Sequence, residues 1–254
     1  MTTGTVPIVT FWRDFVTMGT VPVVTLMEMK YMNDNKSAYN AGIYDEHIVN
    51  VLPYYAEYHK QVIDVAINMG FEAPQWLDTG CGTGTLAAKA LEVMPDARFT
   101  LCDPSEKMLA QAKEKLQNQN IRFLNVPSDR LEFSNEFDVV TAIQSHHYFD
   151  EAGRELAVKN CYRALKDGGA FITFENIRMD TDESDAIALK RWIRYLEEHG
   201  NSPEDVRMHI ERRGVEVFPI TIEKHIELLK KAGFSSVNVL WASYLQAGFW
   251  AIKT

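Results

Sequence analysis

The chain has 254 residues and a formal net charge of −9, and hydrophobic residues make up 46% of it. This length suits one domain with a sizeable core, or a core domain with a small subdomain. The acidic balance argues against a protein that binds nucleic acid regardless of sequence, because such a protein needs a basic surface to neutralise phosphates.

The number and spacing of the cysteines and the lack of long apolar runs favour the cytoplasm. Cys81, Cys102 and Cys161 are far apart and odd in number, which is typical of reduced thiols in the cytoplasm. No apolar run approaches the roughly 18 residues of a membrane span. Residues 1–10 lack the basic start and long apolar stretch of a signal peptide. We therefore expect a cytoplasmic protein with no membrane partner.

The first 36 residues form an extension that contains a repeat. The sequence GTVPIVT at residues 4–10 returns as GTVPVVT at residues 19–25. Two copies are too few for a solenoid, and their β-branched residues and proline suit an edge strand or a strand start. The sequence leaves open whether the extension pairs as a ribbon, covers the active site, mediates a homodimer or is poorly ordered.

A helical pattern follows, and then strands and helices alternate. Apolar residues recur with helical spacing over residues 41–69, and Pro53 predicts a break between two helices. The alternation from Gln75 onward is typical of a parallel, doubly wound sheet. We expect strands at residues 75–78, 98–102, 121–126, 137–143 and 170–175, and helices at residues 85–94, 105–119 and 151–165. Ser105 suits a helix N-cap, and residues 166–169 suit a helix stop and a turn.

The last third of the chain departs from this alternation. Residues 178–219 contain charged helical segments that carry aromatic residues. A helix at residues 221–232 and two strands at 236–241 and 244–252 follow. The short connection at residues 242–243 predicts that these two strands form an antiparallel hairpin.

A glycine-rich loop follows the first strand of the alternating region. Gly80, Gly82 and Gly84 allow a tight turn and let a ligand approach the main chain. Asp103, at the end of the next strand, is placed to accept hydrogen bonds from both hydroxyls of a ribose. The dinucleotide spacing fails when it is counted from Gly80, but it is met by Ala87 when it is counted from Gly82. Asp78 fits an amine-bearing ligand better than a pyrophosphate, which disfavours a nicotinamide or flavin cofactor without eliminating it.

Several segments in this order resemble the class I S-adenosylmethionine-dependent methyltransferases. The matching segments are residues 77–84, 101–109, 125–129, 137–149 and 165–171. The resemblance implies an α/β fold with a doubly wound, Rossmann-like seven-stranded sheet, a final antiparallel hairpin and a helical lid and cap. It also implies S-adenosylmethionine (SAM) as cofactor and S-adenosylhomocysteine (SAH) as product. The corresponding regions are an extension at 1–36, a lid at 37–74, a SAM-binding core at 75–176, a cap at 177–219 and the end of the core at 220–254.

The resemblance also implies a role for individual residues. Those expected around the methionine part of SAM are Asp78, Gly80, Cys81 and Gly82. Those expected at the ribose and adenine are Asp103, Pro104, Met108, Ser128 and Asp129. Gln144 and Ser145 are expected beneath the sulfonium, and Tyr44 and Tyr55 are candidates in the lid.

The candidate catalytic residues are His146, His147 and Tyr148. An imidazole titrates near neutrality and suits a general base. However, methyl transfer can proceed by positioning alone, so packing remains the favoured role for the two histidines. Adjacent residues at a strand end point to opposite sides, and we therefore expect no metal site at this pair.

Other polar and aromatic residues have an ordinary interpretation beside a functional one. The acidic residues Asp180, Asp182, Glu183 and Asp185 suit the start of a solvated helix better than a cation site. In the cap, an arginine could clamp a carboxylate or lie on the surface; the candidates are Arg207, Arg212 and Arg213. Core packing is the default for the large aromatic residues Trp192, Tyr195 and Trp241, with a substrate pocket as the alternative.

The favoured function is in-line methyl transfer from SAM to a small molecule. The first alternative resembles carboxy-S-adenosylmethionine synthase and needs an arginine that faces the sulfonium. The second is a SAM-binding protein without turnover. RNA methylation is disfavoured by the acidic balance, so the expected partner is a small-molecule substrate and no nucleic acid.

Overall fold

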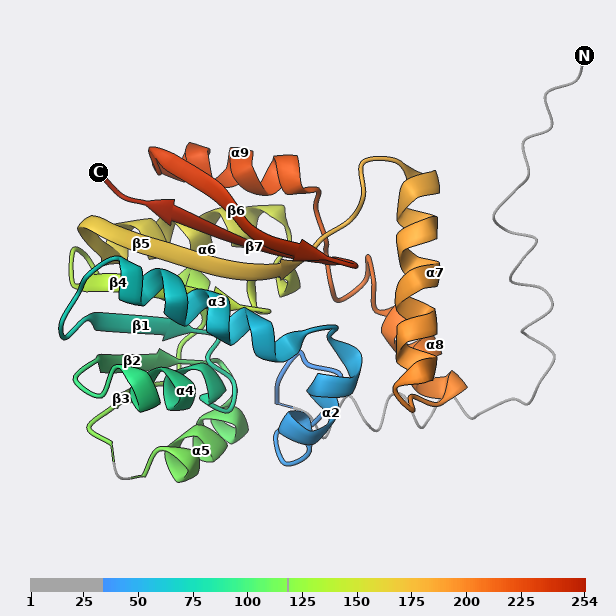
Figure 1. Cartoon of the computed structure of the whole chain (residues 1–254), viewed down its shortest axis with the longest axis horizontal. Coiled ribbons are helices and arrows are strands. Elements are labelled where there is room, and N and C mark those ends of the chain that lie inside the picture. Colours follow the sequence, from blue (N-terminus) through green and yellow to red (C-terminus); the bar gives the residue numbers. More distant parts are fainter. Residues whose placement is uncertain (1–33, 118) are drawn as a thin grey trace, which may run out of the picture. The chain divides into compact units, whose positions relative to one another are not determined.

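A mixed sheet forms the centre of the computed structural model, which describes residues 34–117 and 119–254 (Figure 1). In these residues the sheet has seven strands in the order β3-β2-β1-β4-β5-β7-β6. The strands are β1 Gln75–Thr79, β2 Arg98–Cys102, β3 Arg122–Leu124, β4 Phe137–Ile143, β5 Leu165–Asn176, β6 Ser236–Ser243 and β7 Gln246–Ile252. The repeat at residues 4–10 and 19–25 lies outside the described residues, as does almost all of the extension.

The strand directions confirm the doubly wound sheet and its final hairpin. Strands β1 to β5 pair with one another in parallel. Strand β7 is antiparallel to both β5 and β6. The chain moves outward from β1 to β3 and then returns to place β4 on the other side of β1. Ligands of such sheets bind at this switch point, beyond the carboxyl ends of the strands.

The helices lie where the sequence places them, with shifts at their ends. They are α2 Tyr44–Val51, α3 Tyr55–Asn68, α4 Thr85–Val93, α5 Glu106–Lys115, α6 Glu151–Ala164, α7 Asp182–Glu198, α8 Pro203–Glu211 and α9 Ile222–Ala232. The predicted break at Pro53 is confirmed between α2 and α3. Ser105 is the N-cap of α5 and accepts a hydrogen bond from the Met108 N–H. The acidic residues at the start of α7 lie in its first turn, as expected for a helix dipole.

The predicted helix stop is confirmed, and one predicted turn is displaced. Helix α6 ends at Ala164, and the β4–β5 pairing passes from Phe137↔Leu165 to Val139↔Ala170, so residues 166–169 form an irregularity at the start of β5, with Gly168 at a φ of +80°. The hairpin connection is Tyr244 and Leu245 instead of residues 242–243. Tyr244 adopts a φ of +52°, as a short hairpin turn requires. A tyrosine gives no sequence signal for a positive φ.

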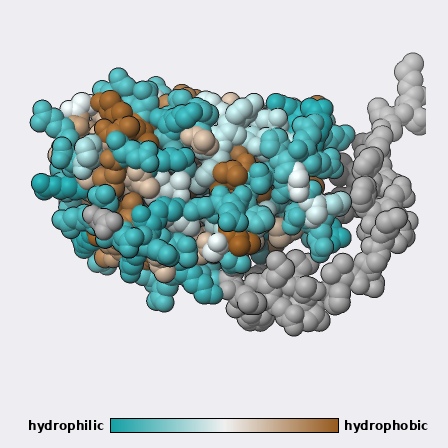
Figure 2. Space-filling model, turned by 60° about the horizontal axis from the view of Figure 1, so that its bottom comes forward, coloured by the Kyte–Doolittle hydropathy of each residue, from teal (hydrophilic) through white to brown (hydrophobic). Residues whose placement is uncertain are grey.

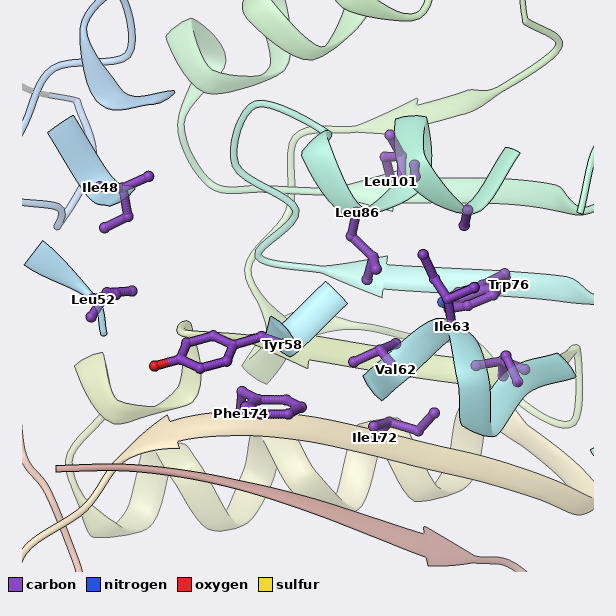
Figure 3. Close-up of a cluster of buried hydrophobic side chains, with 14 of the residues drawn as sticks. Ile48, Leu52, Tyr58, Val62, Ile63, Trp76, Leu86, Leu101, Ile172 and Phe174 are labelled. Carbon is purple, nitrogen blue, oxygen red and sulfur yellow. The ribbon is translucent and has the colours of Figure 1, made fainter. Parts of the chain in front are cut away.

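Apolar side chains cover both faces of the sheet. On one face, α3 and α4 pack on Trp76, Phe99 and Phe174, and Figure 3 shows Tyr58 of α3 lying over Phe174. On the other face, α6 and α9 pack on residues such as Leu77 and Phe171. Successive residues of a strand thus pack into the cores on opposite faces of the sheet, which is typical of a parallel sheet buried on both sides. The carboxyl ends of β1, β4 and β5 are held rigidly by this packing.

The outer surface is mainly polar. Hydrophilic residues cover most of the face shown in Figure 2, and hydrophobic ones occur in separate groups. Among the described residues, no helix combines the length and the apolar character that crossing a bilayer would require.

We expect Gly248→Ala to destabilise the fold. Gly248 of β7 pairs with Phe174 of β5, and an added Cβ would lie 2.5 Å from the Phe174 ring. Because Tyr58 stacks on the same ring at 4.7 Å, the ring has little room to move. Overpacking of this kind costs about 1–3 kcal/mol.

Denaturant unfolding monitored by circular dichroism measures this change. Gly42→Ala is the control, because its Cβ would meet only Asn40 Oδ1 at 3.4 Å. Equal free energies of unfolding for the two variants would contradict the packing described for β5 and β7.

Candidate active site

The glycine-rich loop connects β1 to α4 at the switch point of the sheet. Gly80, Gly82 and Gly84 have φ values of +69°, +54° and +75°, a region that disfavours side chains with a Cβ. A Cβ on Gly80 would lie 2.4 Å from the Ser145 Cβ, so the loop and the end of β4 pack directly on each other. Apart from the two chain neighbours of Gly82, no atom of the described residues lies within 4 Å of a Cβ built on it. The main chain at Gly82 therefore faces open space that a ligand can enter.

Asp78 is a buried carboxylate at the base of this loop. It is 2% exposed and accepts a hydrogen bond of 2.7 Å from the Thr141 hydroxyl. Burial raises the pKa of Asp78 to about 7, the charge of Asp103 adds to the increase, and the Thr141 hydrogen bond opposes it. A nearby ammonium group would favour the charged form, which is what the amino group of SAM offers.

Asp103 connects the end of β2 to the loop. Its Oδ2 accepts the Gly82 N–H at 2.9 Å, and its Oδ1 accepts the Ser105 N–H at 2.9 Å. Burial raises the pKa of Asp103 despite these two hydrogen bonds. A carboxylate offers about four acceptor positions, so acceptor capacity remains for ribose hydroxyls. Met108 is buried in the first turn of α5, directly after this acid.

Asp129 has a buried acceptor without a partner. It lies in the 3-10 helix η2 Ser128–Arg130, and within the described residues its Oδ1 atom has no hydrogen bond. The 6-amino group of an adenine is a donor that would satisfy it. The Ser128 hydroxyl instead lies 2.7 Å from the Thr79 hydroxyl, so its side chain supports the end of β1. Together with Asp78 and Asp103, this unpartnered acceptor fits SAM.

Gln144 and Ser145 follow β4 and have different roles. The Ser145 hydroxyl donates to the Thr79 carbonyl at 3.3 Å and lies against Gly80. Gln144 has a φ of +54°, and its side-chain amide contacts Gln246 at 2.9 Å and Asn176 at 3.2 Å. Gln246 closes the ring by donating to Asn176 at 3.0 Å. Sequence reasoning missed Gln246 and Asn176, although each is a polar side chain at the end of an otherwise apolar strand.

A pocket adjoins this amide ring. Its empty volume, with open solvent included, is about 610 Å³. Apolar side chains of the lid and cap line it, among them Ile48, Val51, Leu52 and Trp192. Its polar lining includes Gln144, Asn176, His147, Tyr148, Arg212 and Arg213.

The lid and cap contact each other around the pocket. The Trp192 indole N–H of α7 donates to the Val51 carbonyl of α2 at 2.9 Å. The Tyr39 hydroxyl lies 3.1 Å from Nε2 of His209 in α8. Tyr44 lines the pocket as expected for a lid residue. Tyr55 is hydrogen-bonded to Tyr44 behind the pocket lining and packs on Tyr58 and His59.

The candidate catalytic residues lie in a 3-10 helix, η3 His146–Tyr148, and not at a strand end. His146 points into the core, where its ring stacks on Phe171 and burial lowers its pKa to about 4. His147 and Tyr148 line the pocket. The two histidines do separate, although the cause is the turn of η3. No group of three or more potential metal ligands occurs in the described residues.

The three cap arginines differ in their surroundings. Arg207 is about half exposed and lies near Glu204 and Glu211. Arg213 donates to both carboxylate oxygens of Asp185 at 3.0 and 3.1 Å. Arg212 donates to Glu216 at 2.8 Å and to the Lys36 carbonyl. Only the last two line the pocket, and both are held by partners within the chain.

Comparison with known proteins agrees with this geometry. Residues 77–169 match the methyltransferase domain family. The chain is 25% identical to carboxy-S-adenosyl-L-methionine synthase of Nautilia profundicola, over 84% of this chain and 92% of the relative. It is 27% identical to the protein of that name from Staphylococcus epidermidis, over 86% and 96%. A malonyl-[acyl-carrier protein] O-methyltransferase of Acetivibrio thermocellus is 32% identical, over 39% of this chain and 35% of the relative.

Solved structures show the same fold. YcgJ of Bacillus subtilis has a TM-score of 0.57 at 18% identity, over 74% of this chain and 71% of that chain. A proposed methyltransferase of Bacillus halodurans has a TM-score of 0.55 at 19% identity, over 72% of each chain.

The switch-point loop lies in a doubly wound α/β sheet, and its buried acids are the groups that we expect to hold SAM. The methyltransferase domain matched at residues 77–169 and the relatives support an enzyme that uses SAM, and the fold is shared with solved methyltransferase structures.

We expect the affinity for SAM to fall as the pH falls below about 7. In this range Asp78 takes up a proton, and a neutral carboxyl cannot pair with the ammonium group of the ligand. Proton linkage predicts up to about a tenfold rise in Kd per pH unit. Calorimetric titration with SAH between pH 5.5 and 8.5 measures this dependence.

Asp78→Asn tests the assignment to Asp78. This variant should bind SAH weakly and with little dependence on pH. Because the folded-state pKa is raised, the contribution of Asp78 to stability is lost as pH rises through about 7. At pH 8 the ligand-free variant should therefore be more stable than the unmodified chain. A flat affinity profile for the unmodified chain would contradict this assignment.

We expect Asp45→Asn to accelerate SAH release. Asp45 of α2 accepts hydrogen bonds from Thr83 of the loop at 2.6 Å and from Lys115 of α5 at 2.7 Å. Because its side chain is 45% exposed, the loss should be about 1 kcal/mol or less, or up to about fivefold in the dissociation rate. Stopped-flow displacement of SAH measures it. Glu46→Gln, with the same charge change one residue away, is the control, and equal release rates would contradict a role of Asp45 in holding the lid.

Proposed function

We propose that this enzyme transfers the methyl group of SAM to a small molecule bound between the lid and the cap. The observation that carries this proposal is the pocket beside Gln144, which is lined by lid and cap residues. Small-molecule sites are concave and mostly apolar, with few placed polar groups. A macromolecular acceptor would need an open surface beside the sulfonium instead.

The residues of the chain would act mainly by positioning SAM and the acceptor. When bound, SAM supplies an electrophilic methyl group. Asp78, Asp103 and Asp129 would hold its amino group, ribose and adenine, while the amide ring around Gln144 fixes the wall between cofactor and acceptor. Holding the nucleophile in line with the methyl group supplies much of the rate enhancement. The apolar lining around Trp192 limits water as a competing nucleophile.

The location and assembly of the protein stay predictions. The free thiols Cys81, Cys102 and Cys161 support a cytoplasmic protein. A homodimer through the extension depends on residues outside those that the structure describes.

A second function has its own support. The carboxy-S-adenosyl-L-methionine synthases match this chain over most of their length, and Arg212 lines the pocket. A guanidinium there would suit a carboxylate on the cofactor. Against it, Arg212 is already bound to Glu216 and the Lys36 carbonyl.

Mass spectrometry separates the two functions. The full chain is incubated with SAM that carries a trideuterated methyl group and with a low-molecular-weight filtrate of a cell extract. Methyl transfer predicts SAH and a product that gains the labelled methyl group, and Asp78→Asn should form neither. A carboxylated cofactor bound to the purified chain would support the second function. Absence of SAH, labelled product and carboxylated cofactor would contradict both.

A further inference from the structure

A buried carboxylate lies directly behind the pocket-lining histidine. Glu175, near the end of β5, is 1% exposed. Its Oε2 accepts the His147 N–H at 2.9 Å and lies 2.9 Å from Nδ1 of the same residue. Its Oε1 accepts the Thr173 hydroxyl at 2.7 Å and the His146 N–H at 3.3 Å. Four hydrogen-bond donors thus surround this carboxylate.

These contacts keep Glu175 ionised. Burial opposes its charge, but the hydrogen bond from His147 holds the pKa of Glu175 below its usual value. The other charged or titratable groups that interact with it include His146, His225, Arg154, Tyr148 and Cys161. Burial keeps both of these histidines neutral, with pKa values of about 4. Arg154 is 4% exposed and supplies a balancing positive charge near Glu175.

The hydrogen bonds also define the tautomer of His147. An ionised carboxylate only accepts hydrogen bonds, so Nδ1 carries the proton that points to Glu175. Nε2 then holds a lone pair. The side-chain nitrogen of Asn176 lies 3.4 Å from Nε2 and the main-chain N–H of Asn176 lies 3.4 Å from Nδ1, and both contacts are too long to compete with the 2.9 Å contact between Nδ1 and Glu175. His147 therefore presents an unprotonated nitrogen in a residue that lines the pocket.

We propose that His147 is the general base of the reaction and that the acceptor is a hydroxyl on a small, mostly apolar molecule. This inference rests on the methyl transfer proposed above. The hydroxyl oxygen forms a bond to the methyl carbon while the carbon–sulfur bond breaks and its electron pair passes to sulfur. The hydroxyl proton moves to Nε2 of His147. The resulting imidazolium is stabilised by the ionised Glu175, which stays unprotonated.

A hydroxyl acceptor needs this base more than other nucleophiles do. A neutral hydroxyl is a weak nucleophile, and it becomes strongly acidic as its oxygen gains a methyl group. A neutral amine already carries an available lone pair and can lose its proton after transfer. The apolar side chains Ile48, Leu52 and Trp192 suit the body of such an acceptor.

Nuclear magnetic resonance of the full chain with ¹⁵N-labelled histidine tests the tautomer. SAH is the added ligand, and His147→Asn assigns the signals. At about pH 8 we expect His147 to carry its proton on Nδ1 and none on Nε2. A proton on Nε2 at this pH, in either the other tautomer or an imidazolium, would overturn the proposal. This readout needs no acceptor, so it is independent of whether methyl transfer occurs.

Kinetics with SAM and the low-molecular-weight filtrate test the catalytic role. His147→Asn should lower kcat for SAH formation by about 10²-fold or more, with the Kd for SAH unchanged. Glu175→Gln should shift the acidic limb of the pH profile to lower pH, because the imidazolium loses its negative partner. His225→Asn is the control: His225 is buried near Glu175 but does not line the pocket, and this variant should keep the profile.

Equal kcat values for His147→Asn and His225→Asn, at equal SAH affinity, would overturn the proposal. A variant that fails to bind SAH is replaced by His147→Gln, to which the same comparison applies. If the unmodified chain forms no SAH, the result counts against methyl transfer itself, whereas the tautomer is read separately.

Discussion

The hydrogen bond from the Gly82 N–H to Asp103 connects the parts on which the site depends. It links the loop after β1 to the end of β2, while Gly80 packs on Ser145 after β4. The three strand ends therefore hold one loop in one conformation, at the point where the sheet reverses its order. A side chain at Gly80 would separate the loop from β4, and the loss of Asp103 would release it from β2.

The buried acids around this loop destabilise the ligand-free protein. Asp78 and Asp103 are buried near each other, and burial raises the pKa of both. Asp129 adds a buried acceptor without a partner in the described residues. Each of these groups is unfavourable alone, and we propose that a different part of SAM satisfies each one, namely its ammonium group, ribose and adenine. Such local conflicts are expected at functional sites. Around the pocket, by contrast, the polar side chains already have hydrogen-bond partners. The three amides of the ring bond to one another, and Glu175 accepts hydrogen bonds from four donors.

Much of the fold and of the cofactor site could be predicted because their signals are local. Periodic apolar residues, the glycine loop, Pro53 and the acids at strand ends each act within a few residues of sequence. The acceptor side could not be predicted in the same way. The role of Glu175 depends on η3, which places His147 against its carboxylate. Gln246 lies some 70 residues from its partner Asn176. The early placement of the hairpin turn has a similar origin, since the positive φ of Tyr244 is imposed by the pairing of β6 with β7.

The central claim is that SAM binds at this loop with its amino group on Asp78. A crystal structure of the full chain with SAH, grown at about pH 8, tests it most directly. The account predicts the ligand amino group within hydrogen-bonding distance of the Asp78 carboxylate, the ribose hydroxyls on Asp103 and the adenine amino group on Asp129 Oδ1. It also predicts that the ligand sulfur faces the pocket beside Gln144. A ligand bound elsewhere, or one whose amino group lies away from Asp78, would contradict it.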